Sequence, residues 1–199
     1  MKQYVEFELT KEFRDHFLEA LDQRDRAFIE QSLREVNPVD ITALLYEFNA
    51  EDSKYTMDIL PVEVRADILK GLDSDTRKSF LKIYEPAEIC GIVNLLDSDD
   101  AADLLNELPI KVSEEVLMGL DPVLRSQVID LLRYEENVAG GLMAKELIKV
   151  RDHWTVVQCV EEIRKQAGLV EKFYTIFVVD ENDKLLGKVA LQDLVISDA

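Results

Sequence analysis

The chain has 199 residues with a formal net charge of −18 at pH 7, and 47% of its residues are hydrophobic, which allows one sizeable core or two modest ones. This acidic balance argues against nucleic-acid binding, because phosphate backbones require clustered Lys and Arg side chains. No stretch approaches the roughly 18 to 20 consecutive apolar residues of a membrane span, and two cysteines, Cys90 and Cys159, suggest neither a disulfide framework nor a zinc site. We therefore expect a soluble, cytosolic protein of two domains.

Short helices are predicted for the first domain, residues 1–133. Helices at about residues 10–21 and 24–36 lack a repeat signature and are expected to cap a stack. Residues 38–81 then align without gaps with residues 86–129 at an offset of 48, and 11 of the 44 pairs are identical. A finer period of 24 residues is also visible, because a polar turn follows the end of an apolar helix at this spacing. The unit is therefore a short helix and a turn.

Each repeat unit has one apolar face, as in residues 86–96, where Ile89, Ile92, Val93 and Leu96 fall at helical spacing. A single helical hairpin cannot bury such a stripe, so the sequence predicts that neighbouring hairpins stack into a right- or left-handed superhelix. The handedness stays open at this stage. Asp97 and Asp121 are predicted to cap helices.

A change of period marks the second domain. Residues 134–145 are predicted to form a linker with the pair Gly140-Gly141, whose tolerance of positive φ suits a change of chain direction. Residues 146–199 then give a strand at 147–150, a helix opened by a Thr155 capping box, strands at 173–179 and 184–190, and a helix at 191–196. This order, with Val178-Val-Asp-Glu-Asn-Asp-Lys-Leu-Leu-Gly187 and Leu191-Gln-Asp193-Leu, resembles a single cystathionine-β-synthase-type (CBS) domain.

Three motifs in succession carry a wider resemblance: the run from Leu96 to Leu105 with Leu108-Pro109, then Glu135-Glu136 with Ala139-Gly-Gly-Leu-Met143, then the CBS strands. Together they resemble the cytosolic region of the MgtE family of magnesium channels, in which an acidic helical superhelix is joined to CBS domains. The resemblance implies a cytosolic Mg²⁺ sensor at the membrane face that closes on ion binding and shuts an attached pore. It also implies a second CBS domain, a transmembrane pore and a homodimer as partners. The printed chain ends without that second domain or pore, so we expect it to be part of a longer protein.

Asp99 and Asp103 match the family's acidic positions, Gly140 lies in the double-glycine motif, and the resemblance implies these three residues as magnesium ligands. One helical turn separates Asp99 from Asp103, so their fields add on one face, and Mg²⁺ prefers carboxylate, carbonyl and water oxygens. Gly140 would offer a main-chain carbonyl without side-chain obstruction. The alternative interpretation is that both aspartates are solvated charges that favour a helix N-terminus.

Two other functions stay open. The CBS resemblance suggests adenine nucleotide, with Asp193 at the ribose position, although Ala190 stands where nucleotide binders carry Ser or Thr. The acidic repeat also resembles the helical domains of the flagellar switch protein FliG, which act as protein-interaction scaffolds. No nucleophile and base pair or phosphate loop is visible, so enzymatic activity is not expected.

Overall fold

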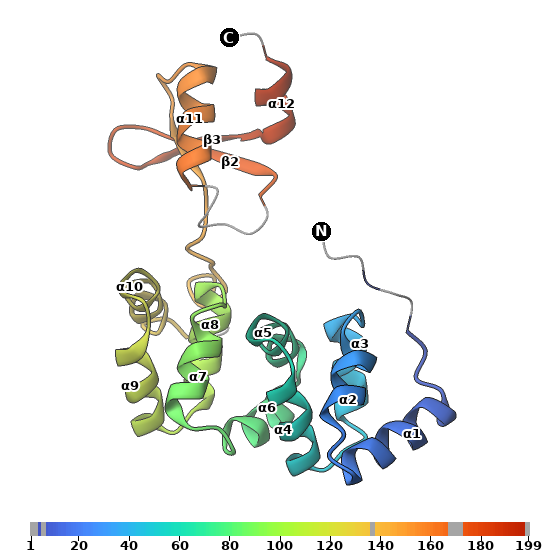
Figure 1. Ribbon diagram of the computed structural model, residues 1–199. Coiled ribbons are helices and arrows are strands. Elements are labelled where there is room, and N and C mark those ends of the chain that lie inside the picture. The colour runs from blue at the N-terminus through green and yellow to red at the C-terminus, as the bar shows by residue number, and fades with distance from the viewer. Residues whose placement is uncertain (1–3, 5–6, 136–137, 167–172, 198–199) are drawn as a thin grey trace. The chain divides into compact units, whose positions relative to one another are not determined.

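The computed structural model describes residue 4 and residues 7–135, 138–166 and 173–197, and it divides the chain into two compact units, residues 1–141 and 142–199 (Figure 1). The described part of the first unit is entirely helical. Its helices are α1 Lys11–Asp22, α2 Arg26–Leu33, α3 Pro38–Leu45, α4 Ala50–Ile59, α5 Val62–Gly71, α6 Ser74–Leu81, α7 Pro86–Val93, α8 Ser98–Glu107, α9 Ile110–Gly119 and α10 Pro122–Leu131. The fold class predicted for this region is confirmed.

The internal repeat of the sequence is also the repeat of the structure. The helices α3 to α6 begin 48 residues before α7 to α10, each at the same spacing. Polar residues hold most of these starts: the Asp73 carboxylate accepts from the N–H groups of Asp75 and Thr76, and the Asp121 carboxylate accepts from the Val123 N–H at 2.9 Å. Prolines open α3, α7 and α10, where no N–H partner is needed.

Packing between successive helix pairs buries one continuous apolar core through the first unit, as expected for a solenoid. The helices α3 and α5 pack together, and so do their counterparts α7 and α9. Gly119 shows how closely the second pair approaches, because a Cβ atom at this position would lie 2.8 Å from the Cys90 sulfur. A side chain at residue 119 would therefore require the Cys90 side chain to move.

One arginine in each repeat ties consecutive helices together. Arg77 donates to the Leu69 carbonyl oxygen at 3.4 Å, and Arg125, its counterpart 48 residues later, donates to the Met118 carbonyl oxygen at 3.2 Å. Both carbonyls belong to the last turn of the preceding helix, where backbone acceptors lack helical partners. The identity of these two arginines in the repeat thus has a structural cause.

The second unit is a three-stranded sheet with two helices, as predicted for a CBS domain. Its elements are β1 Lys149–Arg151, α11 Val156–Gln166, β2 Thr175–Val179, β3 Leu185–Ala190 and α12 Leu191–Ile196. The sheet order is β1-β2-β3, with β1 parallel to β2 and β2 antiparallel to β3. The Thr155 capping box is present, because the Thr155 N–H donates to Gln158 Oε1 at 2.9 Å and the Gln158 N–H donates to Thr155 Oγ1 at 3.3 Å. Ile148, Ile163 and Ile176 lie in the core of this unit.

Two local expectations are wrong. Asp97 occupies the N-cap position of α8 but makes no capping hydrogen bond, and its carboxylate lies 3.9 Å from the Lys70 Nζ atom. Neither Gly140 nor Gly141 has a positive φ, so the double glycine does not serve the backbone conformation that we expected. Of the described helices, none has the length and apolar character needed to cross a membrane.

Candidate functional site

Helix α8 carries the predicted acidic positions on its outward side. Ala101, Leu104 and Leu105 of this helix are buried in the core, whereas Asp99 is partly exposed and Asp103 is exposed. A separation of four residues places Asp99 and Asp103 on the same face, one turn apart. The apolar positions of the repeat therefore fix which way these two carboxylates face.

The Asp99 side chain is not fully satisfied. Its Oδ1 atom is buried and has no hydrogen-bond partner among the described residues. A buried carboxylate oxygen without a partner costs free energy, because it has lost its water without gaining a donor. The site thus has an oxygen that could accept a water molecule or ligate a cation. Asp103, by contrast, has an interaction with another group.

A lysine of the preceding repeat borders this acidic face. The Lys70 ammonium group forms an ion pair with Asp100, and its Nζ atom is 3.9 Å from the Asp97 carboxylate. The hydrogen bond with Asp100 raises the pKa of Lys70 against the lowering effect of burial, and the negative charges of Asp100, Asp97 and Asp99 add to the rise. Lys70 therefore offsets part of the negative field at the start of α8.

A more buried ion pair lies at the carboxyl end of α8. Arg77 binds Glu107 through two hydrogen bonds of 2.7 and 2.8 Å, and the two side chains are only 17% and 9% exposed. Burial raises the pKa of Glu107, but the hydrogen bonds from Arg77 and Ser74 outweigh it, so the net pKa lies below its usual value. Glu107 is therefore a structural carboxylate rather than an available metal ligand.

Gly140 lies in the turn that follows α10. It is partly buried, and the N–H group of the next residue donates to the Val138 carbonyl oxygen at 2.9 Å. The space that a side chain would need is filled by Tyr134, because a Cβ atom on Gly140 would lie 2.4 Å from the Tyr134 ring. Close approach of this ring, rather than an unusual φ, accounts for glycine here.

Asp193 belongs to the second unit, in the short helix α12. Its side chain is exposed, and its carbonyl oxygen accepts hydrogen bonds from the Ser197 N–H and hydroxyl groups at 3.1 and 2.6 Å. Ala190 is the N-cap of this helix and provides no side-chain hydrogen bond. The hydroxyl group that commonly caps a helix or meets a phosphate is thus absent at this position.

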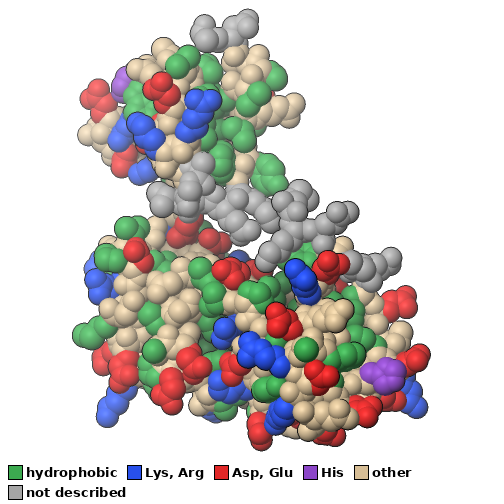
Figure 2. Space-filling view, in the orientation of Figure 1, with side chains coloured by type: hydrophobic (Ala, Val, Ile, Leu, Met, Phe, Trp, Pro, Cys, Tyr) green, Lys and Arg blue, Asp and Glu red, His purple; other side chains and the backbone are tan. Residues whose placement is uncertain are grey.

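The described residues contain no group of three or more His, Cys, Asp or Glu side chains arranged to hold a metal ion. Figure 2 shows Asp and Glu side chains spread over much of the visible face of the helical unit. In the sequence, residues 1–141 contain 31 Asp and Glu and 15 Lys and Arg, whereas residues 142–199 contain 10 and 8. The negative charge is therefore concentrated in the helical unit, where its field attracts cations.

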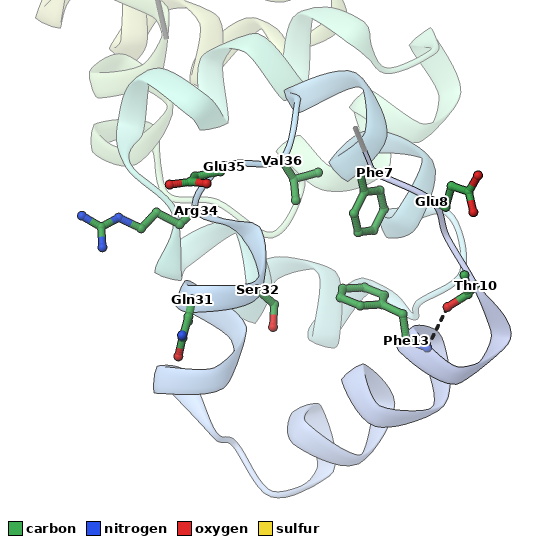
Figure 3. A pocket seen from close by; sticks show the side chains of 9 residues that line it. All are labelled: Phe7, Glu8, Thr10, Phe13, Gln31, Ser32, Arg34, Glu35 and Val36. Atoms are coloured by element: carbon green, nitrogen blue, oxygen red, sulfur yellow. Dashed lines mark hydrogen bonds between the residues drawn. The ribbon is translucent and has the colours of Figure 1, made fainter. Parts of the chain in front are cut away.

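A cavity of about 560 Å³ lies near the amino-terminal end of the helical unit. Figure 3 shows the Phe7 and Phe13 rings on one side of it, with their centroids 5.0 Å apart, while Arg34 and Glu35 extend away from the rings. Thr10 accepts a hydrogen bond from the Phe13 N–H at 3.2 Å, as the N-cap of α1. These contacts stabilise the start of α1 and the segment before it, and they do not bring an acid and a base together.

Comparison with known proteins identifies the family. The family model of the MgtE intracellular N domain matches residues 36–137, and the CBS domain model matches residues 138–197. The chain belongs to the MgtE family. The recognition made from its three motifs is confirmed.

Two relatives of this MgtE chain are magnesium transporters. The MgtE magnesium transporter of Thermus thermophilus is 34% identical over 183 residues, which are 90% of this chain and 41% of that protein. The MgtE magnesium transporter of Enterococcus faecalis is 32% identical over 72 residues, which are 36% of this chain and 16% of that protein. The chain therefore spans about two fifths of the Thermus thermophilus relative.

Two solved structures share the fold. The cytosolic domain of the Mg²⁺ channel MgtE in complex with ATP has a TM-score of 0.83 and 34% identity, and the match covers 91% of this chain and 74% of that one. The soluble part of a magnesium transporter has a TM-score of 0.76 at 23% identity, covering 94% of this chain and 74% of that one. The second likeness concerns the fold alone.

Sequence reasoning missed the cations that border α8. The identity of Arg77 and Arg125 in the repeat was a visible signal, but it did not indicate that Arg77 also binds Glu107, 30 residues away. Lys70 gave no signal at all, since its counterpart 48 residues later is Met118. Both contacts join neighbouring repeats, so they depend on how the helices stack.

Proposed function

We propose that this MgtE chain is the cytosolic Mg²⁺-sensing region of a magnesium channel or transporter, in which Mg²⁺ binds at the acidic face of α8. The observation that carries this proposal is the pair Asp99 and Asp103 on one exposed face, with the buried Asp99 Oδ1 atom lacking a hydrogen-bond partner among the described residues. Mg²⁺ retains several of its waters, so one or two carboxylates suffice for a weak site. A weak site suits a sensor of an abundant ion.

Charge supplies the proposed response to Mg²⁺. The helical unit has 16 more acidic than basic residues, so bringing another acidic surface against it is unfavourable without cations. Bound Mg²⁺ would lower the local negative charge and bridge carboxylates or main-chain carbonyls, with Gly140 as a proposed carbonyl ligand. We propose that the resulting closure of the cytosolic region shuts the pore of the complete protein, which acts as a homodimer.

A second CBS domain is the partner that we propose for the sheet unit. The edge strand β3 and helix α12 expose Leu185, Leu186, Val195 and Ile196, whose side chains are 59%, 53%, 72% and 71% exposed. Such a set of exposed apolar side chains is typical of an interaction surface rather than of a free monomer face. Packing of another CBS domain on β3 and α12 would bury them.

Titration of residues 1–199 with MgCl₂ tests the α8 site directly, with NaCl used to hold the ionic strength constant. We expect saturable shifts of the α8 backbone amides in heteronuclear NMR spectra in the millimolar range, together with Mg²⁺-specific compaction in small-angle X-ray scattering. Asp99→Asn with Asp103→Asn should abolish the α8 shifts while helix content stays unchanged. The amide shifts are local, so they do not require a second CBS domain.

Glu63→Gln with Asp67→Asn is the matched control. These two carboxylates are exposed and lie four residues apart on α5. Their substitution removes the same charge as the Asp99/Asp103 variant from the same type of helix face. The control variant should respond to Mg²⁺ like the native chain. Equal shifts in the native chain and the Asp99/Asp103 variant would contradict the proposed site and favour a scaffold whose acidic faces are only solvated.

We also propose adenine nucleotide as a second ligand, at the CBS unit, with Asp193 as a contact to the ribose hydroxyl groups. The support is the 34% identical cytosolic domain that was solved in complex with ATP. Ala190 provides no hydroxyl group to the α12 N-terminus, which predicts weaker binding than in a CBS domain with Ser or Thr there. ATP titration by calorimetry, repeated with Asp193→Asn, tests this proposal. Equal ATP affinity in the native chain and the variant would show that Asp193 does not contact the nucleotide.

A further inference from the structure

A second cavity of the helical unit, of about 440 Å³, lies between consecutive repeats. The carboxyl end of α6 forms one wall, and the turn from α8 to α9 forms the other. Its lining residues are Lys78, Leu81, Lys82, Tyr84, Glu107, Leu108, Pro109 and Val112. We call it the inter-repeat cavity. Its volume lies in the range of small-molecule sites, which is about 300 to 1,000 Å³.

Most of the lining is apolar, but one wall is cationic. Lys78 and Lys82 are four residues apart at the end of α6, so they lie one turn apart on the same side. Both side chains are exposed, and neither has a described ion-pair partner within 4 Å, although the charge of Lys78 also acts on Glu107. The one carboxylate of the lining, Glu107, is already neutralised by Arg77 at 2.7 Å. Two positive charges therefore border an apolar hollow in a strongly acidic chain.

A comparison of the lining residues with their counterparts in the repeat shows which of them helix stacking requires and which occur only at this cavity. The apolar residues recur 48 residues earlier, where Leu33 corresponds to Leu81 and Val64 corresponds to Val112. The lysines do not recur. Their counterparts are Glu30 and Arg34 in one direction and Ser126 and Asp130 in the other. Stacking of the helices thus needs the apolar wall but does not need two lysines.

We propose that the inter-repeat cavity binds an amphipathic anion, a small molecule with an apolar chain and a single terminal carboxylate or phosphate. The apolar chain would lie against Leu81, Leu108 and Val112, and the anionic group would reach the Lys78 and Lys82 ammonium groups. A free anion fits better than a lipid in an anionic bilayer, because the net charge of −18 repels a molecule with one charged group less than a whole anionic membrane surface.

Sodium decanoate, below its micellar concentration, is the probe for the test. Residues 1–199 should bind it saturably at one site, with NMR shifts of amides around the cavity, and should bind uncharged 1-decanol at least several-fold more weakly. Lys78→Gln with Lys82→Gln should weaken decanoate binding about tenfold, since each charge-assisted contact contributes a few-fold to affinity. Both lysines are exposed, so helix content and the urea midpoint of this variant should match the native chain.

Lys11→Gln with Lys111→Gln is the matched control, because it removes the same charge from exposed lysines that do not line the cavity. This control should bind decanoate like the native chain. Absence of saturable binding, or equal affinity in the Lys78/Lys82 variant, would overturn the proposal, and equal binding of decanol would overturn the anionic class. Flotation with phosphatidylglycerol vesicles should show no binding. Vesicle binding that depends on Lys78 and Lys82 would assign the cavity to a bilayer lipid instead.

Discussion

Replacing Glu107 with Gln tests how the solenoid is held together between repeats. The Glu107 side chain is 9% exposed and Arg77 is 17% exposed, so the substitution leaves a largely buried guanidinium group without its hydrogen-bonded counter-charge, with only the more distant charges of Asp103 and Asp100. Removal of one partner from a buried ion pair costs about 3–5 kcal/mol. Arg77 keeps its hydrogen bond to the Leu69 carbonyl oxygen and some access to water, so we expect a loss near the lower end, about 3 kcal/mol.

Urea denaturation measures this loss. With a slope of about 2 kcal/mol per molar urea, a loss of 3 kcal/mol lowers the midpoint of the helical unit by about 1.5 M. Far-UV circular dichroism reports mainly the helical unit. The only tryptophan, Trp154, packs against the core of the CBS unit and reports that unit by fluorescence. The Trp154 transition should not move.

The exposed ion pair of Lys70 with Asp100 provides the comparison. These side chains are 49% and 27% exposed, so Asp100→Asn should cost only about 0–1 kcal/mol. A Glu107→Gln midpoint shift no larger than that of Asp100→Asn would refute the reasoning from burial. Replacing both members of the buried pair, as Arg77→Met with Glu107→Leu, should recover most of the lost stability, because no charge is then left unpaired.

Three smaller predictions concern single contacts. Tyr46→Phe removes the 2.7 Å hydrogen bond that is the main reason why the pKa of Asp73 is lowered to about 2. An NMR titration of this variant should therefore find a higher pKa for Asp73. In the native chain Asp73 stabilises the fold above about pH 4, and this contribution is lost as the pH falls towards 2. Gly140→Ala should lower stability by about 1 kcal/mol in urea denaturation, and much less in a Tyr134→Ala background, because the three atoms nearest to the new Cβ atom all belong to that ring; an equal cost in both backgrounds would contradict this. Tyr84→Phe should leave the urea midpoint unchanged or raise it, because the buried hydroxyl group makes no hydrogen bond of good geometry and faces the negative charge of Asp58; a clear loss of stability would show that it binds the Asp58 carboxylate.

Local sequence patterns were sufficient for most of the fold. The offset of 48 residues predicted the repeat, and α12 spans 191–196 as predicted from the sequence. Short-range capping was predictable where the partner lies three residues away, as for Thr155 and Gln158. It failed for Asp97, whose carboxylate makes no capping hydrogen bond and lies 3.9 Å from Lys70 of the preceding repeat. The magnesium positions Asp99, Asp103 and Gly140 and the nucleotide position Asp193 stay predictions.

The sequence by itself determined the class of the protein, its repeat and the face of α8 on which the acidic residues lie, because each of these follows from periodicity along one chain segment. Only the tertiary structure decided which charges are already compensated. The contacts of Arg77 with Glu107 and of Lys70 with Asp100 join groups whose distance depends on packing, and the space next to Gly140 that the Tyr134 ring fills depends on packing as well. Electrostatic and steric interactions depend on distance in space, and stacking sets that distance between residues that the sequence keeps up to 30 positions apart.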